Sequence, residues 1–115
     1  MMSYQLHEQK CQACEGIGEA LNAQQIQLMR PQIANEWVVA EDLLSLQRKF
    51  QFKNYYQTMA FVNALAWIAH QENHHPDLVV CYNHCEVTWS THALKGLSIN
   101  DFICAAKTDK LLQNT

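Results

Sequence analysis

The sequence predicts an α+β fold, a two-layer sandwich in which a four-stranded, mostly antiparallel sheet carries three helices on one face. Three observations predict it. Two pairs of β-prone runs are each joined by a short turn, an amphipathic segment of helical period separates the pairs, and shorter helical segments lie before and after them. The predicted order is therefore helix, strand, strand, helix, strand, strand, helix.

Length and composition narrow the class of protein. The 115 residues suffice for one domain with a core but not for two, and we expect a flexible leader over residues 1–20 and a single domain over residues 21–115. A net charge of −3 leaves no basic face for a phosphate backbone, so no direct nucleic-acid partner is expected. Neither a long apolar run nor an apolar signal region occurs, which predicts a cytoplasmic protein without a membrane partner.

The first helix is predicted to begin after Asn22. Asn22 and Gln25 have the spacing of a capping box, and apolar residues recur at helical spacing over 26–33. Pro31 falls inside this pattern and removes a backbone donor, so the helix should be short or kinked near Arg30.

The first hairpin is predicted from a β-prone run over 36–40, a turn at Glu41-Asp42, and an alternation of apolar and polar residues over 44–53. Only Arg48 breaks the apolar side of that alternation. A charged residue in that place either reaches solvent at a sheet edge or points into a site, and the edge position is the one expected.

The main helix is predicted over residues 54–73. Asn54 and Gln57 form a second potential capping box, and the apolar residues that follow recur at helical spacing. Pro76 disfavours the helical conformation at His75, so the helix should end at or before the paired histidines.

The second hairpin is predicted from β-prone runs over 78–82 and 85–91, joined by Asn83-His84, because Asn readily adopts positive φ in such turns. This register pairs Tyr82 with Cys85 and places residues 75–77 opposite residues 90–92. The same pattern makes Tyr82 a residue of the sheet core and His84 a turn residue.

The closing helix is predicted to begin after Ser98, with Asp101 completing a third capping box. That structural role fully accounts for Asp101 without any catalytic one. Trp89, on the strand before this helix, is expected in the sheet core rather than against a bound ring.

Five of the six histidines lie between residues 70 and 92. His74 and His75 stand at the predicted end of the main helix, and His92 follows a strand that the hairpin folds back beside them. Imidazoles titrate near neutral pH, so rings that converge in one cleft can donate a proton to a leaving oxygen and accept one from a nearby nitrogen. The arrangement therefore predicts an acid–base site.

These residues also resemble a known family. The run His70-x3-His74-His75-Pro76-x5-Tyr82-x9-His92-x8-Asp101, with Ser-Thr-His at 90–92 and Gly-Leu-Ser at 96–98, resembles the signature of the pterin-4a-carbinolamine dehydratases. The likeness extends over residues 21–112, and the Cys11-x2-Cys14 segment resembles the leader of some bacterial members.

The resemblance implies a hydro-lyase that dehydrates 4a-hydroxytetrahydropterin to the quinonoid dihydropterin. In that family the reaction recycles the pterin cofactor of aromatic amino acid hydroxylases and needs neither a metal nor an organic cofactor. The resemblance also implies a homodimer or homotetramer.

By position, the resemblance assigns catalysis to His74, His75 and His92, and we expect His74 and His92 to transfer protons while His75 positions the substrate. His70 and Asp101 match supporting positions of the family. The residues that match its pterin-contacting segments, in addition to the three histidines, are Asn73, Ser90, Thr91 and Ala93. Many members have a carboxylate where this chain has His70, and this difference affects the expected pH optimum.

Two alternatives remain beside catalysis. His70 and His74 lie one helical turn apart and, with His92, have the residue types of a zinc site. The five cysteines include the pairs Cys11/Cys14 and Cys81/Cys85, but the predicted register places the second pair on opposite sheet faces, so unligated, reduced thiols are expected. Some members of the family act instead as non-enzymatic dimerisation partners of transcription regulators, and a polar sheet face would suit such a role.

Overall fold

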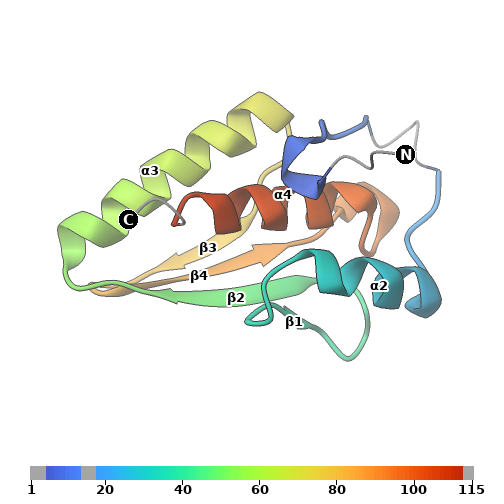
Figure 1. Ribbon diagram of the computed structural model, residues 1–115, viewed down its shortest axis with the longest axis horizontal. Coiled ribbons are helices and arrows are strands. Elements are labelled where there is room, and N and C mark those ends of the chain that lie inside the picture. Colours follow the sequence, from blue (N-terminus) through green and yellow to red (C-terminus); the bar gives the residue numbers. More distant parts are fainter. Residues whose placement is uncertain (1–4, 14–17, 113–115) are drawn as a thin grey trace.

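Three helices lie on one side of a four-stranded antiparallel sheet, as the sequence predicts (Figure 1). The computed structural model describes residues 5–13 and 18–112. In chain order the elements are η1 (Leu6–Glu8), α2 (Ala23–Met29), η2 (Arg30–Gln32), β1 (Val38–Val39), β2 (Leu46–Gln51), α3 (Tyr55–Glu72), β3 (Asp77–Val80), β4 (His84–Trp89), η3 (His92–Leu94) and α4 (Ile99–Lys110).

The sheet has the strand order β1-β2-β4-β3, and all three pairings are antiparallel. Alternate residues of β4 are buried, which places Cys85, Val87 and Trp89 on the face toward the helices. The opposite face presents polar residues such as Gln47 and Thr88, whose side chains form a hydrogen bond of 3.1 Å. The predicted division into an apolar and a polar sheet face is confirmed.

The helix boundaries follow the predicted capping signals. Capping boxes are present at Asn22 and Ser98, and the side chain of Asn54 accepts a hydrogen bond from the backbone of Gln57. α2 ends at Met29, and a short 3-10 helix containing Pro31 follows it. Proline therefore ends this helix in the predicted way.

The register of the second hairpin differs from the prediction by two residues. Val80 pairs with Cys85, and the backbone of Cys81 donates to the carbonyl of His84, so the two-residue turn is Tyr82-Asn83 rather than Asn83-His84. A two-residue slip returns every side chain to the same face, and for this reason the apolar pattern alone does not distinguish the two registers. His84 consequently begins β4.

The turn is fixed by bonds from outside the hairpin. The Phe52 amide donates to the Asn83 carbonyl at 2.7 Å, and the Thr58 hydroxyl donates to the Tyr82 carbonyl at 3.0 Å. Asn83 does not have the positive φ that the prediction assumed. Tyr82 is 65% exposed at the tip of this turn, so the prediction that it belongs to the core is wrong.

Arg48 lies on an interior strand, so its predicted edge position is also wrong. Its side chain points toward the helices, where the guanidinium lies 4.3 Å from the centre of the Phe50 ring and its Nη1 donates to Asp109 Oδ1 at 2.7 Å. The sequence pattern could not reveal this, because the partner carboxylate lies 61 residues further along the chain.

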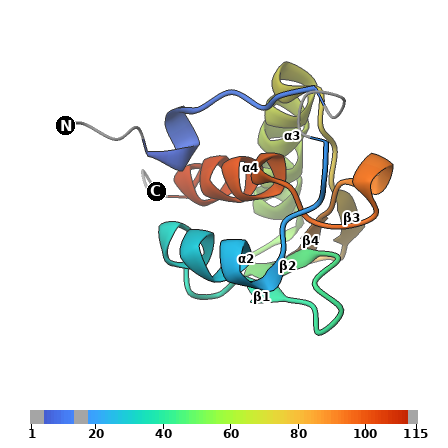
Figure 2. The same cartoon turned by 90° about the vertical axis from the view of Figure 1, so that its right-hand side faces the viewer.

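The N-terminal segment runs alongside α4 and reaches the end of α3 (Figure 2). Leu6 is buried in the core, and Lys107 Nζ donates to the His7 carbonyl at 2.9 Å. The predicted division at residue 20 stays a prediction, and Cys14 lies outside the described residues. Within the described part of the chain, no helix combines the length and the apolar character needed to cross a membrane.

Candidate functional site

The candidate site begins where α3 ends. Asn73 adopts the left-handed conformation with φ of 52°, and the His74 amide donates to the Ala69 carbonyl at 3.1 Å. A left-handed residue after the last helical turn closes the helix and changes the direction of the chain. This turn directs the His74 side chain to the first turn of α4.

A carboxylate on α4 joins His74 to the end of β4. Asp101 is fully buried, and its Oδ1 lies 2.7 Å from His74 Nε2. Its Oδ2 accepts hydrogen bonds from the Thr91 hydroxyl at 2.8 Å and from the Ser98 amide at 2.9 Å. Asp101 therefore has the predicted capping role and a second role, which the sequence did not reveal, as the partner of a candidate catalytic histidine.

The hydrogen-bond network assigns the state of the His74 ring. A carboxylate only accepts hydrogen bonds, so the proton of the neutral ring belongs on Nε2, which faces Asp101. Nδ1 is then left as the proton acceptor of that ring. An imidazole oriented in this way by a buried carboxylate has the arrangement of a general base.

The His74 ring is also fixed by stacking. It lies parallel to the Trp89 ring, with 5.5 Å between ring centres and 11° between ring planes. Trp89 is fully buried, as predicted, and its ring contact is with His74. The imidazole is thus held on one face by an aromatic ring and at one edge by a carboxylate.

His92 occupies a tight turn after β4. The backbones of Thr91 and Gly96 are joined by a hydrogen bond of 2.9 Å, and the Lys95 amide donates to the His92 carbonyl at 3.1 Å. Lys95 has the positive φ that closes the turn. The His92 side chain is exposed, on a backbone that these bonds fix.

Two cavities are each lined by some of the residues that the sequence predicts for the site. The first, of about 580 Å³, which we call the helix cavity, is lined by Lys10, Cys11, Gln12, Ala13, Gln71, Glu72, Asn73, His74, Ala93 and Asn100. The second, of about 330 Å³, which we call the turn cavity, is lined by Leu44, Ser45, Asp77, Thr88, Ser90, Thr91, His92, Lys95 and Gly96. The hydrogen-bonded chain from Thr91 through Asp101 to His74 connects them.

The structure divides the predicted residues between two cavities, so the three candidate histidines do not converge in one cleft as the sequence predicted. Asn73, His74 and Ala93 line the helix cavity, whereas the 90–92 segment lines the turn cavity. His75 is exposed and lines neither cavity.

His70 lies outside both cavities. Its ring is 5.3 Å from that of Trp67 on the exposed side of α3. Among the residues that the structure describes, no three His, Cys, Asp or Glu side chains converge to form a potential metal site. Cys81 and Cys85 lie on opposite sheet faces, as expected, because Cys85 pairs with Val80.

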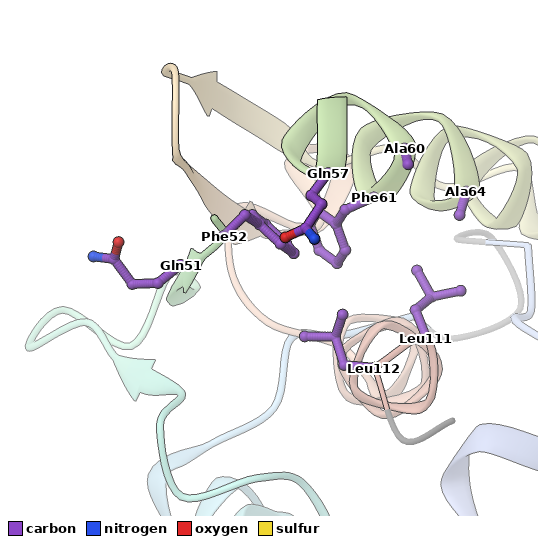
Figure 3. Close-up of a pocket in the computed structure, with 8 residues that line it drawn as sticks. All are labelled: Gln51, Phe52, Gln57, Ala60, Phe61, Ala64, Leu111 and Leu112. Carbon is purple, nitrogen blue, oxygen red and sulfur yellow. The ribbon is translucent and has the colours of Figure 1, made fainter. Parts of the chain in front are cut away.

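A further cavity, of about 510 Å³, lies between the start of α3 and the end of α4 (Figure 3). The residues around it are Gln51, Phe52, Gln57, Ala60, Phe61, Ala64, Leu111 and Leu112. None of these side chains titrates near neutral pH, so the described walls of this cavity offer no group for proton transfer.

Sequence analysis assigned no role to two buried polar residues beside the helix cavity. Glu72 is 5% exposed and accepts a hydrogen bond from the Cys11 amide at 2.8 Å. Asn100, 2% exposed, makes two hydrogen bonds with the backbone of Gln12. An acidic residue in the last turn of a helix opposes the helix dipole, and this was the one signal that Glu72 has a partner elsewhere.

Comparison with known proteins adds independent information. Residues 19–111 match the family described as Pterin 4 alpha carbinolamine dehydratase. The chain is 60% identical to a putative pterin-4-alpha-carbinolamine dehydratase of Legionella pneumophila, over 96% of this chain and 98% of that protein, and 53% identical to one of Nitrosomonas eutropha, over 93% of each chain.

Two solved structures resemble the fold. A transcriptional coactivator/pterin dehydratase from Brucella melitensis superposes with a TM-score of 0.76 at 24% identity, over 81% of this chain and 98% of that one. A pterin dehydratase-like protein described as a RuBisCO assembly factor in the alpha-carboxysome gives a TM-score of 0.60 at 25% identity, over 69% and 92% of the two chains.

Proposed function

The chain belongs to the pterin-4-alpha-carbinolamine dehydratase family, and we propose that it dehydrates a 4a-hydroxytetrahydropterin to the quinonoid dihydropterin. We place this reaction in the recycling of the tetrahydropterin cofactor of an aromatic amino acid hydroxylase. His74, His75 and His92 are the proposed catalytic residues, with Asn73, Ser90, Thr91 and Ala93 around the substrate.

The reaction requires two proton transfers. A proton is delivered to the 4a hydroxyl oxygen, the bond between C4a and that oxygen breaks, and water leaves. The N5 proton is removed, and the electron pair of the N–H bond forms the double bond between N5 and C4a. The proton delivered and the proton removed balance, so the net change is the loss of one water molecule.

The single observation that supports this proposal most strongly is the contact of 2.7 Å between His74 and the buried Asp101. With Nε2–H facing the carboxylate, His74 is suited to accept the N5 proton at Nδ1. His92 is exposed at the adjacent turn cavity and is suited to deliver a proton to the leaving oxygen. His75 is proposed to position the pterin.

A stopped-flow assay with enzymatically generated carbinolamine tests the proposal. We expect His74→Ala and His92→Ala each to lower kcat by about 100-fold or more, the usual contribution of a general acid or base. His84→Ala is the matched control. His84 is a partly exposed histidine at the start of β4, and it lines neither cavity. Full turnover in both site variants, with unchanged circular dichroism and oligomeric state, would contradict the assignment.

A non-enzymatic assembly role is the second candidate. It is favoured by the polar sheet face, which none of the helices in the described part of the chain covers (Figure 1), and by the similarity in fold to the pterin dehydratase-like protein described as a RuBisCO assembly factor. We propose that this face would bind a second copy of the chain, giving a homodimer or homotetramer, or a protein partner. Association that persists in the His74→Ala/His92→Ala double variant, in a protein that never shows turnover, would support this role over catalysis.

A further inference from the structure

The N-terminal segment forms part of the wall of the helix cavity. Residues 10–13 all line it, and the Cys11 amide donates to the buried Glu72 carboxylate at the end of α3. The Gln12 amide donates to Asn100 Oδ1 at 2.9 Å, and Asn100 Nδ2 donates to the Gln12 carbonyl at 2.7 Å. The segment is therefore clamped to α3 on one side and to α4 on the other.

A pair of thiols lies within this clamp. The sulfur of Cys11 is 3.5 Å from the sulfur of Cys104, although the two residues are 93 positions apart in the sequence. Both cysteines are free. A disulfide has a sulfur–sulfur bond of about 2.05 Å, so an approach of roughly 1.5 Å would join them.

We propose that Cys11 and Cys104 form a disulfide when the protein meets a peroxide, and that this bond latches residues 10–13 to α4 at the wall of the helix cavity. Cys11 is the residue that the oxidant reaches, because it is only partly buried and lines the cavity, whereas Cys104 is fully buried. Cys104 is then the thiol that resolves the oxidised Cys11.

The two steps balance with hydrogen peroxide as the oxidant. The Cys11 thiolate attacks one peroxide oxygen, a sulfur–oxygen bond forms, the oxygen–oxygen bond breaks, and the departing hydroxide becomes water. The Cys104 sulfur then attacks the Cys11 sulfur, a sulfur–sulfur bond forms, and the sulfur–oxygen bond breaks with release of a second water. Two thiols are oxidised to one disulfide, and one peroxide is reduced to two water molecules.

The surroundings of Cys104 support this order of events. Its hydrogen bond with Cys11, and then its burial, raise the pKa of the Cys104 thiol well above its ordinary value. A thiol kept protonated in this way is a poor nucleophile toward peroxide in solution. Cys104 therefore reacts only after the oxidation of Cys11 has placed an electrophilic sulfur next to it.

Peptide mass spectrometry without reduction tests the bond. Reduced full-length protein is treated with one equivalent of hydrogen peroxide, and the remaining thiols are blocked with N-ethylmaleimide. We expect an intact mass lower by about 2 Da before blocking and a linked pair of peptides containing Cys11 and Cys104. The Cys14→Ser variant should give the same link, whereas a link between Cys11 and Cys14, a link between two chains, or the absence of any disulfide would overturn the proposal.

Trypsin cleavage after Lys10 tests the latch separately from the bond and from the proposed catalysis. Lys10 is 75% exposed, so its cleavage depends on the freedom of the adjoining backbone. We expect the linked protein to be cut about tenfold more slowly than the reduced protein. Cys11→Ser, a change at a partly exposed position, should be cut at one rate with or without peroxide, and an equal rate for linked and reduced wild type would overturn the latch.

Discussion

The two ends of α4 each present a carboxylate that ties the helix to the rest of the fold, but with different partners. Asp101, in the first turn, contacts the imidazole of His74 at 2.7 Å, and Asp109, in the last turn, contacts the guanidinium of Arg48 at the same distance. Trp37 Nε1 also donates to Asp109 at 2.8 Å. The geometry is similar, so the difference lies in the chemistry of the partner.

We infer that this difference separates a pair that stabilises the fold from a pair that serves the proposed catalysis. A guanidinium remains charged at every pH a protein meets, so the Arg48–Asp109 ion pair stabilises the fold but does not exchange protons. An imidazole gains and loses a proton near neutral pH, so the same arrangement at His74 and Asp101 can take part in a reaction. The helix cavity and the turn cavity both lie at the Asp101 end.

The largest expected effect is on catalysis, from Asp101→Asn. An asparagine amide that donates to His74 Nε2 reverses the tautomer of the ring and leaves Nδ1 protonated, so it no longer accepts a proton. We expect kcat to fall by about 100- to 10,000-fold in the carbinolamine assay.

Nitrogen NMR of the imidazole distinguishes this positioning role from a merely structural one. The Asp101→Asn variant should move the ring proton from Nε2 to Nδ1 in a protein that remains folded. Asp101→Glu, which retains the carboxylate, should recover part of the activity. Wild-type turnover in the Asp101→Asn variant would contradict the inference that the Asp101 end of α4, unlike the Asp109 end, serves the reaction.

Asp109→Asn should affect stability and leave activity within about twofold of wild type. The change keeps an acceptor for Trp37 but deprives the Arg48 guanidinium of its charged partner in a site where both side chains are less than one-sixth exposed. We expect the free energy of unfolding to fall by about 2 kcal/mol, measured by urea denaturation. A loss of turnover without a loss of stability would contradict this division of roles.

A double-mutant cycle measures the interaction between Arg48 and Asp109 directly, and its expected effect is smaller. Arg48→Met removes the charge that Asp109 faces while keeping an apolar chain against Phe50. We expect the Arg48→Met/Asp109→Asn double variant to be about 1 kcal/mol more stable than the sum of the two single changes predicts. Strict additivity would show that the pair does not interact.

Much of the fold could be predicted because its signals are local. Capping boxes, apolar periodicity and Pro31 gave the helix boundaries, and alternation gave the sheet faces. The hairpin turn was misplaced by one residue, and the strand register therefore by two, because Tyr82 and Asn83 are held by bonds from Phe52 and Thr58, which no local pattern encodes.

The site was predicted less completely for the same reason. The sequence motif identified the histidines as candidate site residues. Which cavity each histidine lines depends on contacts between residues that are distant in the sequence. Asp101 was assigned only its local capping role, since its contact with His74 spans 27 residues. Glu72 and Asn100 received no role, because their partners are in the N-terminal segment.

The smallest expected effect concerns the buried thiol of Cys85 on β4, where a charge without hydrogen-bond donors is unfavourable. Burial, with smaller contributions from Cys81 and Glu86, raises the pKa of the Cys85 thiol from 9.0 to about 11. Between these pH values the unfolded chain releases this proton and the native protein does not, so the free energy of unfolding should decline as the pH rises from 9 toward 11. Cys85→Ala should lose this part of the slope, and at pH 8.5 iodoacetamide should label Cys81 while Cys85 reacts only after unfolding. Rapid labelling of native Cys85 at this pH would contradict the prediction, because it would show that burial does not suppress ionisation of the thiol.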